Sequence, residues 1–121
     1  MNAIVYPYGD TLPAPGTALE LVPGLRWIRM PLPYALNHIN LWLIEDGEGK
    51  WCAVDTGMDM GDVKTHWQTL IAEYPLARQI VTHYHPDHLG LAAWLQEQTG
   101  APLAMTQAEY LTAQAFANET G

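Results

Sequence analysis

The sequence predicts one small α/β domain in which a β-hairpin is followed by alternating helices and strands. Two observations support this fold class. Two apolar segments, residues 39–45 and 50–54, flank the turn-forming residues 46–49. After Gly61, apolar residues recur with the 3.6-residue period of a helix. The chain has 121 residues, of which 49% are hydrophobic and 15% charged, so it carries enough apolar material for one buried core.

The remaining elements are expected in a regular order. Proline is frequent before Tyr34, so residues 1–38 are expected to form loops and one short strand at Leu25–Met30. The helix after Gly61 is expected to end before Pro75, and parallel pairing is expected after the hairpin. The later elements are expected to be a strand at Arg78–Thr82, a helix from about His88 to Gln98 that stops at Gly100, a strand at Pro102–Met105, and a helix that opens with the capping box Thr106–Glu109.

Composition excludes several classes of function. The formal net charge is -8, from 5 Lys and Arg against 13 Asp and Glu, which disfavours binding to nucleic acid or to an anionic membrane. No serine is present, which excludes serine-nucleophile hydrolases, and the single cysteine excludes an intrachain disulfide. No signal-peptide pattern or long apolar run is found, so a cytoplasmic location is expected.

One histidine-rich stretch, residues 82–90, has the composition of a metal site. His83 and His85 are two residues apart at the end of a predicted strand, so both imidazoles are expected to point to one side. Two converging imidazoles suit zinc or a similar divalent ion. Asp87 and His88 follow at the mouth of the next helix, where they are placed to hold a second metal.

Each of these residues also has a simpler interpretation. Asp87 alone is compatible with a helix N-cap, and His83 and His85 with ordinary strand-end residues. Their joint spacing favours the metal site over these separate roles.

The pattern His83-x-His85-x-Asp87-His88 resembles the signature of the metallo-β-lactamase superfamily of metal-dependent hydrolases. Upstream, Val54-Asp55-Thr56-Gly57 closes a strand in the manner of that family's Asp-Thr-Gly element. The resemblance covers Ile39 to about Gly100. It implies an αβ/βα sandwich built from two similar halves.

The resemblance implies a role for each motif residue. His83 and His85 would bind a first metal, and Asp87 and His88 a second, with Asp87 also orienting the attacking water. The implied cofactor is zinc, with two ions in the intact protein and with iron or manganese as alternatives. Asp55 would lie beside the site and support it without binding a metal directly; an Asx turn at the strand end is its alternative role.

After His88 the sequence contains no further His or Asp, although the family takes additional ligands from its second half. The chain therefore reads as a fragment, with residues 1–121 forming a partial domain. Residues 1–38 would be its Pro-rich entrance and residues 39–121 the α/β half that carries the motif. The missing half of the fold, or self-association through an exposed sheet, is the partner expected.

The implied activity is hydrolysis of a small-molecule ester, thioester, lactone or amide by a metal-bound hydroxide. Among the branches of the family, the glyoxalase II-like hydrolases are the most similar. The chain alone is expected to be inactive because each metal would have only two ligands. The alternative is a catalytically inactive half-domain that binds metal weakly or associates with a partner.

Four further residues lie outside the histidine-rich stretch and are assigned roles in substrate contact or in the fold. Tyr34, Leu36 and His38 lie on or beside the Pro-rich loop and are candidates for substrate contact, although a hydrogen-bonded loop role is favoured for His38. His66 is expected to be structural, beside the apolar face of its helix.

Overall fold

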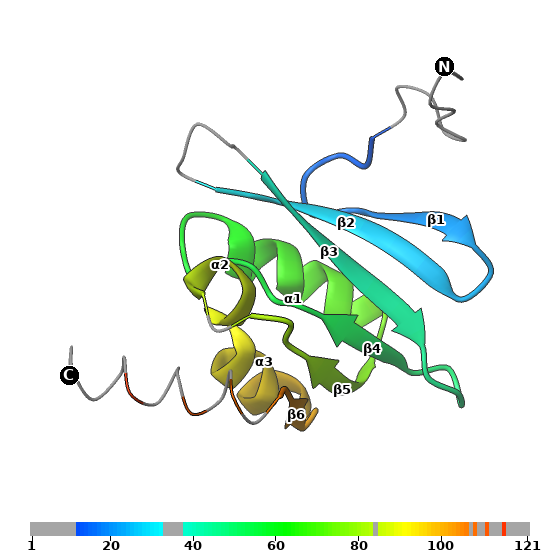
Figure 1. Ribbon diagram of the computed structural model, residues 1–121. Helices are drawn as coiled ribbons and strands as arrows, with labels where there is room; N and C mark the ends of the chain where they lie inside the picture. Colours follow the sequence, from blue (N-terminus) through cyan, green and yellow to red (C-terminus); the bar gives the residue numbers. More distant parts are fainter. Residues whose placement is uncertain are drawn as a thin grey trace, which may run out of the picture.

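A computed structural model describes residues 12–32, 38–83 and 85–106, together with residues 108, 111 and 115 (Figure 1). Its elements in chain order are β1 (Ala18–Val22), β2 (Leu25–Pro31), β3 (His38–Glu45), β4 (Trp51–Val54), α1 (Val63–Glu73), β5 (Leu76–Ile80), α2 (Pro86–Leu89), α3 (Ala92–Thr99) and β6 (Leu103–Ala104). No helix in this described part of the chain is long and apolar enough to cross a membrane.

All six strands form one sheet in sequence order, β1-β2-β3-β4-β5-β6. The pairs from β1 to β4 are antiparallel, whereas β4–β5 and β5–β6 are parallel. The predicted hairpin is β3–β4, and the predicted change to parallel pairing comes directly after it. The α/β fold class is therefore confirmed, and the carboxyl ends of β4 and β5 lie at one edge of the sheet.

The core lies on one face of the sheet because alternate strand residues point to the same side. The helices pack on this face (Figure 1). Its buried strand residues include Ile28 and Met30 of β2, Leu41 and Leu43 of β3, and Ala53 of β4, packed against Val63, Trp67 and Leu70 of α1 and Leu95 of α3. Trp67, the largest of these, is fully buried.

The opposite face of the sheet carries apolar side chains that none of the helices α1 to α3 covers. Trp27 and Trp42 stack there with their ring centroids 6.3 Å apart, and Trp27 donates a hydrogen bond to the Asn40 side chain. Ile44 and Ile80 on the same face are 43% and 39% exposed. The predicted strand at residues 39–45, which is apolar at nearly every position, thus presents one of its two faces without a covering helix among the described residues.

Three expectations about the elements need correction. β1 is an additional strand in the Pro-rich region, which pairs with β2 across the turn at residues 23–24. β5 spans Leu76–Ile80 and ends two residues before the predicted strand end. The single helix expected at His88–Gln98 is two helices, α2 and α3, because the backbone N–H of Leu91 is held by the Thr56 hydroxyl rather than by a preceding turn. α3 does end at Gly100, as predicted.

The last predicted helix lies mostly outside the described residues, where only Ala108, Leu111 and Ala115 are described, each with helical backbone.

The segment that precedes β1 crosses α1 at a close contact between Gly16 and His66. Gly16 has a φ of +75° and donates its backbone N–H to the carbonyl of Arg29. A Cβ at Gly16 would overlap the imidazole of His66. The contact indicates that His66 acts as a packing surface for the chain before β1, in keeping with the structural role predicted for it.

We expect Gly16→Ala to lower the free energy of unfolding by about 1–3 kcal/mol more than Gly49→Ala does. Both glycines have positive φ, so both variants carry the same backbone strain, but no atom lies within 4 Å of the Cβ position at Gly49. Urea denaturation followed by tryptophan fluorescence measures the difference. Equal losses for the two variants would mean that the contact with His66 does not constrain the fold.

Candidate active site

Asp55 stands directly after β4 and faces the end of β5. Its backbone N–H donates to the carbonyl of Ile80 at 2.8 Å, which continues the parallel ladder by one residue. Its φ is +64°, a left-handed conformation that aspartate tolerates better than most residues. The side chain is only 6% exposed. The turn thus places a buried carboxylate at the edge of the sheet where the histidine motif begins.

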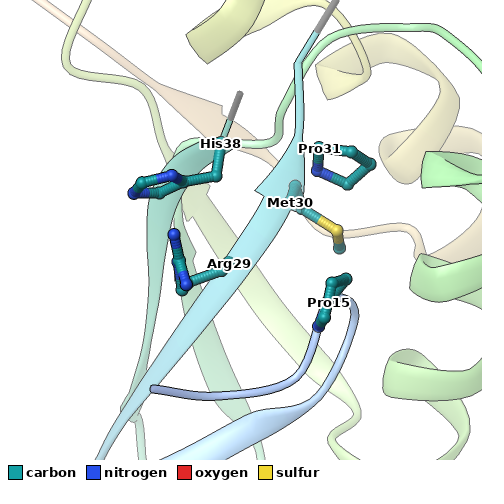
Figure 2. Close-up of a pocket in the computed structure, with 5 residues that line it drawn as sticks. All are labelled: Pro15, Arg29, Met30, Pro31 and His38. Carbon is teal, nitrogen blue, oxygen red and sulfur yellow. The ribbon is translucent and has the colours of Figure 1, made fainter. Parts of the chain in front are cut away.

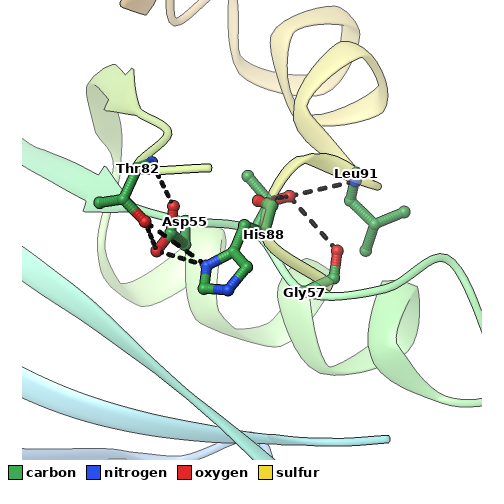
Figure 3. A network of polar contacts seen from close by, with 6 residues as sticks. Asp55, Gly57, Thr82, His88 and Leu91 are labelled. Atoms are coloured by element: carbon green, nitrogen blue, oxygen red, sulfur yellow. Dashed lines mark hydrogen bonds and ion pairs between the residues drawn. The ribbon is translucent and has the colours of Figure 1, made fainter. Parts of the chain in front are cut away.

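Both carboxylate oxygens of Asp55 accept hydrogen bonds from the chain that follows β5 (Figure 3). Oδ1 accepts from the backbone N–H of Thr82 at 2.7 Å. Oδ2 accepts from the Thr82 hydroxyl at 2.7 Å and lies 2.9 Å from Nδ1 of His88. These long-range bonds, rather than a local Asx turn, occupy the carboxylate. Because the Asp55–His88 bond requires a proton on Nδ1, it leaves the ring lone pair on Nε2 in neutral His88.

Thr56 ties the same segment to the end of β4 by a second set of bonds. Its backbone N–H and its hydroxyl both donate to the carbonyl of His88 at 2.9 Å, and its hydroxyl accepts from the backbone N–H of Leu91 at 3.1 Å. Its own carbonyl accepts from Nε1 of the buried Trp67 at 2.7 Å. Thr56 is fully buried, so the C-terminal end of α2 and the residue that precedes α3 are both fixed to one residue of the core.

The three motif histidines lie close to one another. The ring centroids of His83 and His88 are 4.8 Å apart in an edge-to-face arrangement, and those of His83 and His85 are 6.1 Å apart. His83 and His85 are exposed, and the backbone N–H of His88 donates to the carbonyl of His85. The argument that placed His83 and His85 on one side of a strand is wrong, because β5 ends at Ile80. The turn into α2 brings their rings together instead.

The chemistry of these donors fits a divalent metal, because imidazole is a common zinc ligand and a carboxylate orients one of the rings. Among the residues whose side chains are described, no three His, Cys, Asp or Glu converge closely enough to hold an ion. Asp87 lies within α2, and its side chain is outside this described set. The fit therefore rests on the three imidazoles and on the carboxylate that orients one of them.

The candidate substrate-contact residues are described only in part. Tyr34 and Leu36 lie outside the described residues. His38 begins β3 and pairs with Pro31, the last residue of β2.

Two residues that hold this site were not assigned a role from the sequence. Thr82 opens the histidine-rich stretch and Thr56 follows Asp55, so both are neighbours of assigned residues in the sequence. Their position at predicted strand ends could have indicated a role, since a hydroxyl there commonly bonds exposed backbone groups in a turn.

Cys52 is 5% exposed in β4. Burial, followed by the charge of Asp46, raises the pKa of its thiol. The thiol is therefore protonated at neutral pH and packs as a small apolar side chain.

Comparison with known proteins relates this chain to a family. Residues 35–120 match the family model described as the metallo-beta-lactamase superfamily. A hydroxyacylglutathione hydrolase of Pseudomonas aeruginosa (strain LESB58) is 36% identical over 89 residues, which cover 72% of this chain and 33% of that enzyme. The chain thus spans about a third of the length of the curated relatives it matches.

Solved structures show the same likeness. A beta-lactamase domain protein from Burkholderia ambifaria superposes with a TM-score of 0.84 at 44% identity, covering 93% of this chain and 37% of that one. A metallo-beta-lactamase family protein from Thermus thermophilus gives a TM-score of 0.57 at 34% identity, covering 68% of this chain and 28% of that one.

We expect Thr56→Val to lower the free energy of unfolding by about 1–3 kcal/mol, because the buried N–H of Leu91 loses its acceptor. Thr56→Ser keeps the hydroxyl and is the matched control, with a smaller loss. Urea denaturation measures stability, and hydrogen exchange at the Leu91 amide reports the bond itself. Unchanged exchange at Leu91 in Thr56→Val would contradict the role given to the hydroxyl.

Proposed function

Since the chain belongs to the metallo-beta-lactamase superfamily, we propose that it forms part of a metal-dependent hydrolase. The observation that carries this proposal is the 2.9 Å contact between the Asp55 carboxylate and Nδ1 of His88. A carboxylate that holds one nitrogen of an imidazole is the usual support of a histidine ligand. It fixes the tautomer of His88 and would leave Nε2 available to bind a metal.

The residues that would hold the metal are those of the motif. His83 and His85 would bind one ion, and Asp87 and His88 a second. Zinc suits these donors, and iron or manganese are the alternatives. When bound, such ions lower the pKa of water and stabilise the oxyanion that develops during hydrolysis. Asp87 would orient the attacking water, while Asp55 stays bonded to Thr82 and His88 and keeps the ring of His88 in place.

The substrate class we propose is a small-molecule thioester. The hydroxyacylglutathione hydrolases that the chain resembles act, by their name, on the acyl-glutathione bond. The chain has 13 acidic and 5 basic residues, and this negative net charge supports a small-molecule substrate over a nucleic acid. A cytoplasmic location is consistent with such a substrate and is part of the proposal.

A second candidate function follows from the ligand count. Two motif residues for each metal are fewer than the three protein ligands of an ordinary catalytic zinc site. The open face around Ile44 and Ile80 also offers a surface for the second half of the fold or for a second copy. The alternative is thus an inactive half-domain, residues 1–121, that binds metal weakly and associates through its sheet.

We expect this chain to bind zinc, and Asp55→Asn to weaken the affinity about 10–100-fold. The amide of asparagine has only one oxygen, so it cannot accept all of the hydrogen bonds that Thr82 and His88 donate to the two oxygens of the carboxylate. The ring of His88 therefore loses its fixed tautomer. Isothermal titration calorimetry with zinc measures the affinity, and circular dichroism checks that the variant is folded.

His66→Gln is the matched control for this titration, because His66 lies on α1 against Gly16 rather than among the motif residues. Its zinc affinity is expected to match that of the unaltered chain. If the double variant His83→Ala, His85→Ala also binds zinc as the unaltered chain does, the metal assignment is wrong.

Turnover separates the two candidate functions. With added zinc, we expect residues 1–121 alone to show no hydrolysis above background, whereas a chain spanning the full length of its relatives hydrolyses a hydroxyacyl thioester. Release of the thiol is followed with a chromogenic reagent, beside lactones, β-lactams and phosphodiesters. Turnover by residues 1–121 that disappears in Asp87→Ala would show a complete site in this half. No turnover by the full-length chain would favour the inactive alternative.

A further inference from the structure

A pocket of about 190 Å³ lies where β2 extends past the start of β1. Its lining residues are Pro15, Arg29, Met30, Pro31 and His38 (Figure 2). In the register of β2 and β3, Arg29 pairs with Asn40 and Pro31 with His38. Arg29 and His38 are therefore diagonal neighbours on one face of the sheet, and Figure 2 shows both side chains on the same side of the β2 ribbon. The pocket places these two nitrogen-bearing side chains near Pro15 and Pro31, whereas the side chain of Met30 is fully buried in the core on the other face of β2.

The pocket lies at the edge of the sheet that carries the candidate active site. Trp42 of β3 pairs with Val54, the last residue of β4, so residues 38–41 extend beyond the end of β4. The residues of β2 that pair with them extend in the same direction. Asp55, which follows β4, stands at this same edge. A ligand bound by Arg29 would thus lie at the same edge of the sheet as the histidine motif.

Arg29 differs from the other cations of this chain. Arg26, Lys64 and Arg78 each form an ion pair with a carboxylate, and Lys50 is exposed in the turn at the other end of β3. Among the described residues, no carboxylate forms an ion pair with Arg29. Its Nε is buried and has no hydrogen-bond partner within that same set, which is also true of the Nε of Arg26, so the missing ion pair is what sets Arg29 apart. A guanidinium without a carboxylate partner can take an acceptor from outside these residues.

We propose that this pocket binds a carboxylate group of the substrate, with Arg29 as its principal donor. The planar guanidinium matches the two oxygens of a carboxylate, and the imidazole of His38 adds a second polar contact on the same face. Pro15 and Pro31 would contact the hydrocarbon next to the carboxylate. The inference rests on the proposed hydrolase, for which it specifies that the small-molecule thioester carries a free carboxylate.

Binding is tested first, without turnover. The Nε–Hε resonance of Arg29 is followed by ¹⁵N NMR while the protein is titrated with sodium propionate, against sodium chloride at equal ionic strength. We expect a saturable shift with propionate alone. Arg29→Met is expected to raise the dissociation constant about tenfold or more, as loss of a hydrogen-bonded charge pair does. Arg78→Met is the matched control, because Arg78 is an exposed arginine of β5 already paired with Asp46, and it should leave the affinity unchanged.

Kinetics on the full-length protein then relates the pocket to the reaction. For a thioester that carries a carboxylate, Arg29→Met is expected to raise KM about tenfold with little change in kcat, and Arg29→Lys to raise it less. The methyl ester of the same substrate should respond to neither variant. If the Arg29 resonance does not respond to propionate, the inference is wrong. That result is expected if a carboxylate of the protein itself already binds the guanidinium. If propionate shifts the Arg29 resonance but the full-length protein shows no turnover, the carboxylate pocket is supported and the proposed hydrolase function is wrong.

Discussion

The carboxylate of Asp55 is the point on which the candidate site depends. It is held at the end of β4 in a left-handed turn, and its two oxygens reach residues 27 and 33 positions further along the chain. Two bonds go to Thr82 and one to His88, so the segment that leaves β5 is anchored at its start and again within α2. Because the carboxylate is almost fully buried, these bonds are made in a medium of low dielectric, where losing one partner is costly.

Thr56 extends this anchor into the core. Its hydroxyl and backbone bind the carbonyl of His88 and the N–H of Leu91, and its carbonyl accepts from Trp67. The histidine-bearing turn is thereby connected to the largest buried side chain of α1. The same bonds explain why α2 and α3 are separate helices, since the backbone donor of Leu91 is used outside the helix. The core thus sets the position of the candidate ligands through hydrogen bonds as well as apolar contact.

Within the described residues the helices cover one face of the sheet only, and this asymmetry bears on function. The covered face contains the buried residues of β2, β3 and β4, whereas the other face presents stacked Trp27 and Trp42 beside Ile44 and Ile80. Arg29 and His38 belong to this second face, at the end that projects past β4. Whatever covers the open face in the full-length protein would therefore approach both the proposed carboxylate pocket and the edge that carries the histidines.

The sequence by itself determined the α/β class, the β3–β4 hairpin and the helix over Val63–Glu73, and it supplied the motif from which the candidate ligands are proposed. Those features follow from local periodicity, turn residues and the spacing of a short motif, all of which act over a few neighbouring positions. The end of β5 at Ile80, the division of α2 from α3, and the bonds of Thr56 and Thr82 were decided by the tertiary structure. They depend on hydrogen bonds between residues about 30 positions apart, and such a pairing exists only once β4 and β5 lie side by side.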